Sequence, residues 1–73
     1  MTFDEATERL VAMARRNGGS VTARDVEADD ELAADQETVS AAAHALVGST
    51  NVFGSAADAG WFPYAEIHFT DLR

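Results

Sequence analysis

The chain contains no cysteine and no lysine among its 73 residues. Without cysteine, neither disulfide bonds nor a thiolate metal site can supplement the core. No run approaches the roughly 20 apolar residues that a membrane-spanning helix requires. The opening residues MTFDEATERL lack the basic and apolar regions of a signal peptide. We therefore expect a cytoplasmic domain that folds without disulfide bonds, without a thiolate metal site and without a membrane.

Positive charge is also scarce. The chain has 13 aspartates and glutamates against 5 arginines, and its formal net charge is −8. Such an acidic field repels nucleic acid and anionic membrane surfaces. At about 1 M salt the Debye length falls to about 3 Å, so charge alone does not exclude DNA in a salty cell. The excess of acids, the arginine in place of lysine and the abundant alanine resemble halophilic archaeal proteins, with high-GC actinobacteria as the competing source.

The length predicts one domain over residues 1–73, of a size that buries only roughly 60% of the surface of its unfolded chain. Hydrophobic residues make up 47% of the sequence, which is typical of a globular protein. Many of them are alanines, and each alanine contributes little burial. This shortage of buried area leads us to expect a homodimer or a protein partner.

The first predicted helix covers residues 2–17. Thr2 or Asp4 caps its start, and the glycine pair at 18–19 ends it. Spacings of three and four residues place one apolar face along this helix, made of Phe3, Ala6, Leu10, Met13 and Ala14.

A second helix is predicted from Ala23 to about Asp29, because Thr22 and Asp25 have the spacing of a capping box. The following EADDELAAD, residues 27–35, either extends this helix or forms a turn whose Leu32 packs inward. A third helix then begins after Asp35 as its cap and ends at Gly48. Its predicted buried stripe consists of Val39, Ala42, Ala43 and Leu46.

After Gly48 the period of the apolar residues changes from helical to alternating. Two strands, one around Val52 and one in WFPYAEIHF, are expected around a turn at residues 58–60. Alternation places Ala65, Ile67 and Phe69 on the core face, with Tyr64, Glu66 and His68 on the other face. Pro63 has no amide proton, which predicts a sheet edge or a bulge there.

The order helix, short strand, helix, helix, hairpin resembles the winged helix-turn-helix superfamily. The stretches that carry this resemblance are GGSVTARDV at 18–26, TVSAAAHAL at 38–46 and the hairpin at 51–69. The resemblance implies an α+β fold, a three-helix winged helix-turn-helix with a C-terminal β-hairpin wing. It also implies that the third helix occupies the position that reads DNA in bacterial and archaeal regulators. Winged helices serve as protein-interaction modules as well.

The third helix departs from the DNA-reading pattern of the family. Its candidate recognition face consists of Gln36, Glu37, Ser40, Ala41 and His44. Gln36 and Ser40 can hydrogen-bond a base, but no residue of this face neutralises phosphate. The loop SAADAG, where the family usually places arginine or lysine, is equally without cations.

One internal basic cluster is present, made of Arg15, Arg16 and Arg24. Two roles are open for it. The resemblance places these residues near the start of the second helix, where family members touch the DNA backbone. Cations also stabilise the C-terminus of a helix, and solvated surface arginines need no other explanation.

No residue pattern in the chain indicates catalysis or a cofactor. His44 and His68 lie on different elements without metal-ligand spacing. The carboxylates at 29–31 and Asp35 lack the glycine and the alternating ligands of a calcium loop, and no nucleophile accompanies them. We expect a non-enzymatic protein with no metal, no cofactor and no small-molecule substrate.

GWFPY, residues 60–64, holds the only tryptophan and the only tyrosine. Consecutive strand residues point to opposite faces, so Trp61 or Phe62 should be partly exposed. Trp61, Phe62 and Tyr64 are therefore the candidate interface for self-association or a protein partner. We expect an acidic winged-helix adaptor or self-associating regulatory module. The alternative is a DNA-binding transcriptional regulator that works at high salt or alongside a basic partner.

Overall fold

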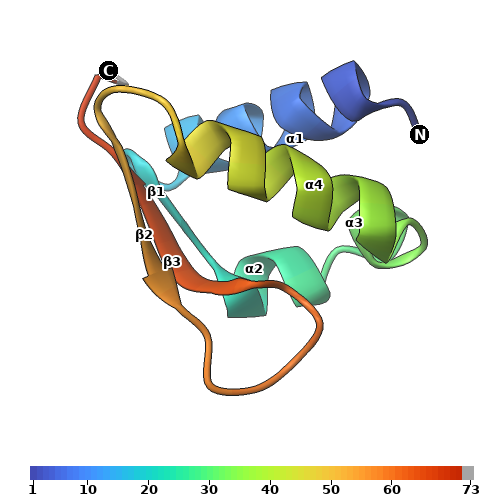
Figure 1. Cartoon of the computed structure of the whole chain (residues 1–73). Coiled ribbons are helices and arrows are strands. Elements are labelled where there is room, and N and C mark those ends of the chain that lie inside the picture. Colours follow the sequence, from blue (N-terminus) through green and yellow to red (C-terminus); the bar gives the residue numbers. More distant parts are fainter. Residues whose placement is uncertain (72–73) are drawn as a thin grey trace.

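A computed structural model describes residues 1–71 of the chain and shows an α+β architecture (Figure 1). Helices pack on one face of a three-stranded antiparallel sheet, which confirms the α+β part of the expected fold class. No helix among the described residues is long and apolar enough to cross a membrane. The elements in chain order are α1 (Phe3–Arg16), β1 (Ser20–Thr22), α2 (Ala23–Glu27), α3 (Asp30–Ala33), α4 (Gln36–Val47), β2 (Val52–Ala56) and β3 (Tyr64–Phe69).

The sheet has the strand order β1-β3-β2, so the last strand of the chain lies in the middle. Ile67 of β3 pairs with Val21 of β1 on one side and with Gly54 of β2 on the other. Directly opposed residues share a face of the sheet. The inner face therefore carries the buried Val21 and Ile67, and the outer face carries the exposed Phe53 and His68.

A β-bulge interrupts the pairing of β2 with β3, close to the position predicted from Pro63. Ser55 pairs with Glu66, but its neighbour Ala56 pairs with Tyr64, which leaves Ala65 as the extra residue. The bulge corrects two assignments made by simple alternation. Ala65, expected in the core, is exposed, whereas Tyr64, expected on the outer face, packs against the core.

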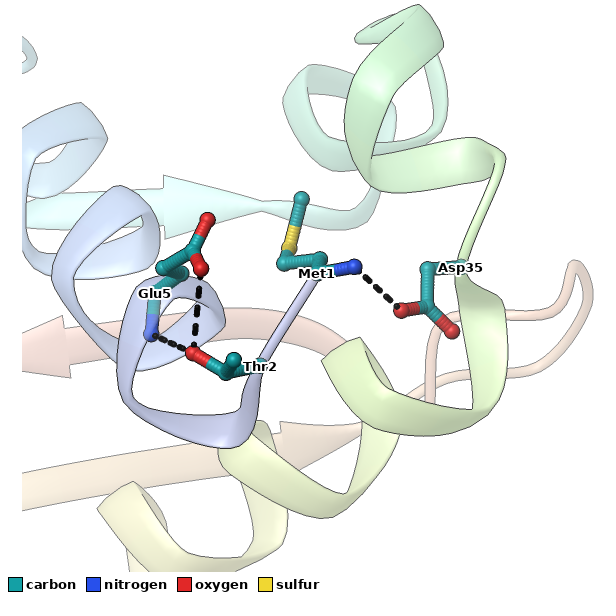
Figure 2. Close-up of polar contacts among 4 residues, drawn as sticks. All are labelled: Met1, Thr2, Glu5 and Asp35. Carbon is teal, nitrogen blue, oxygen red and sulfur yellow. Dashed lines mark hydrogen bonds and ion pairs between the residues drawn. The ribbon is translucent and has the colours of Figure 1, made fainter.

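Side-chain caps fix the starts of the first two helices. Thr2, one of the two predicted caps, accepts a hydrogen bond from the Glu5 amide at 3.1 Å (Figure 2). The predicted capping box is confirmed, since Thr22 and Asp25 each accept a hydrogen bond from the backbone amide of the other. Asn17 adds a hydrogen bond from its side chain to the Asp25 carboxylate at 3.1 Å, which joins the end of α1 to the start of α2.

The ambiguous segment after α2 forms a separate short helix, so the described residues contain four helices rather than three. Asp29 caps this helix α3, because its carboxylate accepts hydrogen bonds from the amides of Glu31 and Leu32 at 3.0 and 3.1 Å. Leu32 is fully buried, as expected for a turn that packs inward. The cap at Asp29 ends the continuity with α2 and directs Leu32 into the core.

The predicted capping role of Asp35 is wrong. Asp35 precedes α4 but makes no side-chain cap, and its backbone, at φ −134° and ψ 58°, departs from the extended conformation of the other caps. Its carboxylate instead lies 3.4 Å from the amino group of Met1, so the start of α4 is held beside the start of α1 (Figure 2).

One hydrophobic core joins the sheet to the helices. Its largest fully buried side chains are Phe62, Leu10, Leu32, Ile67, Val21, Val26 and Val39. Two residues of the predicted apolar faces lie at its margin. Leu46 is only half-buried, and Phe3 is 46% exposed, a turn before the first buried residue of α1. Helical spacing identifies the inner side of a helix but not how far the neighbouring elements extend along it.

Candidate functional site

The outer side of α4 is an exposed surface with almost no charge. Gln36, Glu37, Ala41 and His44 of the predicted recognition face are exposed, and Ser40 is half-buried. Glu37 is the only formally charged residue of the helix. Since a phosphate backbone needs cations opposite it, this surface lacks the electrostatic component of DNA affinity.

His44 connects the α4 surface to the sheet. Its Nδ1 atom lies 3.0 Å from the hydroxyl oxygen of Tyr64, and the two rings meet edge to face with centroids 5.3 Å apart. The bulge at Ala65 makes this contact possible, because it turns Tyr64 toward the helices. Gly54 on the neighbouring strand β2 leaves room for the ring, since a Cβ atom there would come within 2.7 Å of Tyr64. His44 is therefore held by a neighbour instead of reaching freely into solvent.

The loop between β2 and β3, residues 57–63, folds back beside α2 (Figure 1). The backbone amide of Phe62 donates a hydrogen bond to the Glu27 carboxylate of α2 at 3.4 Å. Gly60 takes a left-handed backbone, with φ +89°, against the same carboxylate. Asp58 is the only charged residue of this loop. The tip of the hairpin thus carries no cation and is tied to the body of the domain.

The candidate aromatic interface divides into one core residue and two marginal ones. Phe62 is 1% exposed and belongs to the core, so it is not available to a partner, which corrects its assignment to an interface. Trp61 is half-buried and packs edge to face on Phe62 with centroids 5.9 Å apart. Tyr64 is half-buried between Phe62 and His44.

Arg15, Arg16 and Arg24 are exposed, and none of them forms an ion pair within residues 1–71. Arg15 and Arg16 occupy the last turn of α1. The first turn of α1 lies beside the start of α4, through Met1 and Asp35. A helix of 14 residues is about 21 Å long, so these two arginines are remote from Gln36 and Glu37.

Three of the four carboxylates of the acidic turn have structural partners. Asp29 caps α3, Glu31 pairs with Arg9 at 2.5 Å, and Asp35 pairs with the amino group of Met1. Among residues 1–71, no group of three or more side chains could hold a metal ion. His68 lies on the outer face of the sheet, away from His44. Open surface hollows border α1, and one of them extends from α1 to α3 and Asp35.

One exposed feature was not predicted from the sequence. Phe53 of β2 projects from the outer face of the sheet and is 62% exposed, more than Met1 or Phe3. It lies within residues 49–57, a stretch without any charged residue. Alternation along this stretch could have indicated an outward Phe53, because it places Phe53 on the same face of the strand as the polar Ser55.

Comparison with protein-family models, with curated proteins and with solved structures finds no match to this chain.

Proposed function

We propose that this chain is a winged helix-turn-helix module that acts by binding protein, as an adaptor or a self-associating regulatory domain, and that it catalyses no reaction. The element order and the strand order β1-β3-β2 support the scaffold assignment. In that scaffold α2 and α4 correspond to the helix-turn-helix pair, α3 lies within the turn, and β2 and β3 form the wing.

The observation that carries the proposal is the chemistry of the α4 surface. A DNA-reading helix presents cations and long amides to base edges and phosphates. Here the exposed face offers one carboxylate at Glu37, one amide at Gln36 and a histidine occupied by Tyr64. Duplex DNA would meet an electronegative surface, whereas a neutral or basic protein surface would not be repelled.

The hairpin supports the same conclusion. In DNA-binding winged helices the tip of the wing supplies cations to the phosphate backbone. The loop at 57–63 carries Asp58 and is held against α2 through Glu27. Half-buried Trp61 within this loop offers an aromatic edge of the kind enriched in protein interfaces.

A second candidate function is DNA binding at high salt or together with a basic partner. It is favoured by Arg15, Arg16 and Arg24, which are exposed and without an ion pair within residues 1–71. Gln36 at the first position of α4 can also reach a base edge. Screening at about 1 M salt would remove the repulsion from the net charge of −8.

A salt series of duplex DNA binding tests the choice. We expect fluorescence anisotropy of a labelled duplex to show no binding from low salt to about 1 M salt. Sub-micromolar binding at any salt, weakened by Gln36→Ala and by Ser40→Ala, would establish the DNA-binding function instead. If the basic cluster touches phosphate, Arg15→Gln would then reduce the slope of the logarithm of the DNA-binding constant against the logarithm of the salt concentration.

A further inference from the structure

We propose that the free edge of β2 pairs antiparallel with β2 of a second copy of the chain, so that two three-stranded sheets become one continuous sheet. This inference rests on the self-associating form of the proposed function and names its surface and its partner. The contact lies on the sheet, distinct from α4 and from Trp61.

The hydrogen bonds of β3 show which backbone groups of β2 face the free edge. Thr70 donates from its amide to the carbonyl of Asn51 at 3.0 Å, and Phe69 donates on the opposite side to Gly19 at 2.7 Å. Consecutive residues of an antiparallel strand direct their polar groups to opposite sides. Asn51 and Phe53 therefore direct theirs to β3, whereas Val52 and Gly54 direct theirs outward, where residues 1–71 supply no strand.

This edge lacks the features that normally prevent pairing. Exposed edge strands usually carry charge, proline or a bulge. Residues 49–57, STNVFGSAA, contain neither charge nor proline in a chain whose net charge is −8. The extra residue of the bulge, Ala65, lies on the central strand β3, so β2 itself keeps a regular edge from Val52 to Ser55.

A two-fold axis at Phe53 satisfies the outward groups of both copies. Val52 then lies opposite Gly54 of the second copy, and the reciprocal pair completes about four backbone hydrogen bonds. Phe53 lies opposite Phe53 of the second copy, in the position where side chains approach most closely. The most exposed large apolar side chain of the described residues is thereby covered.

Charge and symmetry favour a second copy as the occupant. Across the joined edges the two β3 strands lie about 14 Å apart, three strand spacings of about 4.8 Å. This separation exceeds the Debye length of about 8 Å at physiological salt, so Glu66 of one copy is screened from that of the other. The contact uses the same edge on both chains and closes at the dimer. A five-residue strand buries less than a standard interface, so the dimer should be concentration-dependent.

Cysteine cross-linking tests the register directly, because the natural chain has no cysteine. In the proposed register the Cα atoms at position 53 of the two copies are about 4.5 Å apart, within disulfide range. We expect mild oxidation of Phe53→Cys to give a disulfide-linked dimer. Ser55→Cys is the matched control on the same strand and face, where the two sulfurs would be about 14 Å apart. No dimer for Phe53→Cys, or equal cross-linking of both variants, would overturn the proposal.

Sedimentation of the unmodified chain gives a second readout. We expect a monomer–dimer equilibrium that shifts at least tenfold toward monomer in Phe53→Glu, since two carboxylates would then meet at the axis. Ser20→Glu is the control, because it adds the same charge to the outer face at the other edge. Higher salt should favour the dimer, because it screens the repulsion between two copies that each carry a formal net charge of −8. Loss of the dimer in Trp61→Ala but not in Phe53→Glu would contradict the assignment to the β2 edge.

The two proposals fail differently. A monomer at all concentrations that binds no duplex DNA would overturn the strand pairing and leave the protein-binding function standing. A dimer disrupted by Phe53→Glu that also binds DNA in the salt series would establish the pairing, and with it self-association, but would replace the adaptor role with DNA binding.

Discussion

The Glu27 carboxylate of α2 accepts a hydrogen bond from the backbone amide of Phe62, 35 residues later in the chain, at 3.4 Å. This contact ties the loop between the two hairpin strands to the helical layer. Phe62 enters the core next to the bond, and Gly60 packs against the same carboxylate. The Glu27 side chain and the buried Phe62 ring thus both hold the hairpin tip against the helical layer.

Gly60→Ala should destabilise the fold by about 1–3 kcal/mol. The left-handed backbone at φ +89° strains any L side chain, and the new methyl group would displace the Glu27 carboxylate. Urea unfolding measures the loss. Gly18→Ala is the matched control, since Gly18 has φ +84° but no neighbour within 4 Å of an added Cβ. Equal losses in both variants would show that the contact with Glu27 contributes nothing.

Glu27→Ala should cost about 1 kcal/mol and loosen the loop, because the Phe62 amide loses its acceptor. Trp61 is the only tryptophan, and its fluorescence should shift to longer wavelength as the loop opens. Glu27→Gln keeps an acceptor oxygen and should retain most of the stability. An unchanged spectrum in Glu27→Ala would mean that the buried Phe62 ring alone holds the loop.

Gly54→Ala should destabilise the domain by about 1–3 kcal/mol, although alanine is usually acceptable in a strand. Its Cβ atom would lie 2.7 Å from the Tyr64 ring and 2.8 Å from Val47, so the contact between α4 and β3 must open. Thermal unfolding measures the change. Gly48→Ala, whose nearest neighbours would lie at 3.5 Å, should be neutral or stabilising. A neutral Gly54→Ala would show that Tyr64 has space to move.

Asp29→Ala should cost about 0.5–2 kcal/mol, because two amides at the start of α3 lose their acceptor. Asp30→Ala removes the same charge one residue later, where the side chain is exposed and makes no cap. The second variant should change the free energy of unfolding by a few tenths of a kcal/mol only. Similar losses in the two variants would assign the effect to net charge.

Local signals in the sequence predicted the parts of the fold that depend on local contacts. The capping box of Thr22 and Asp25 needs only residues three apart, and the structure contains it. The stripe of Val39, Ala42 and Ala43 follows from helical periodicity alone and is buried. The outer face of α4 was predicted by the same periodicity, as the complement of that stripe.

Features that depend on distant contacts were not predicted. Asp35 has the residue type of a cap, but the nearby amino group of Met1 takes its carboxylate. Alternation could not locate the extra residue Ala65, because a bulge is defined by the register against another strand. The free edge of β2 was missed for a related reason. It follows from the strand order β1-β3-β2, and no local pattern of residues determines strand order.

Because of the bulge at Ala65, the length of β2 relative to β3 also determines which side chains of β3 face solvent. One extra residue in β2 between Ser55 and Ala56 would give Ala65 a partner and restore strict alternation, which would rotate Tyr64 outward and withdraw its hydroxyl from His44. The histidine would then be released to solvent without any change in α4 itself. Among related sequences of slightly different length, one extra codon between Ser55 and Ala56 would therefore separate proteins with a free histidine from proteins with a tethered one.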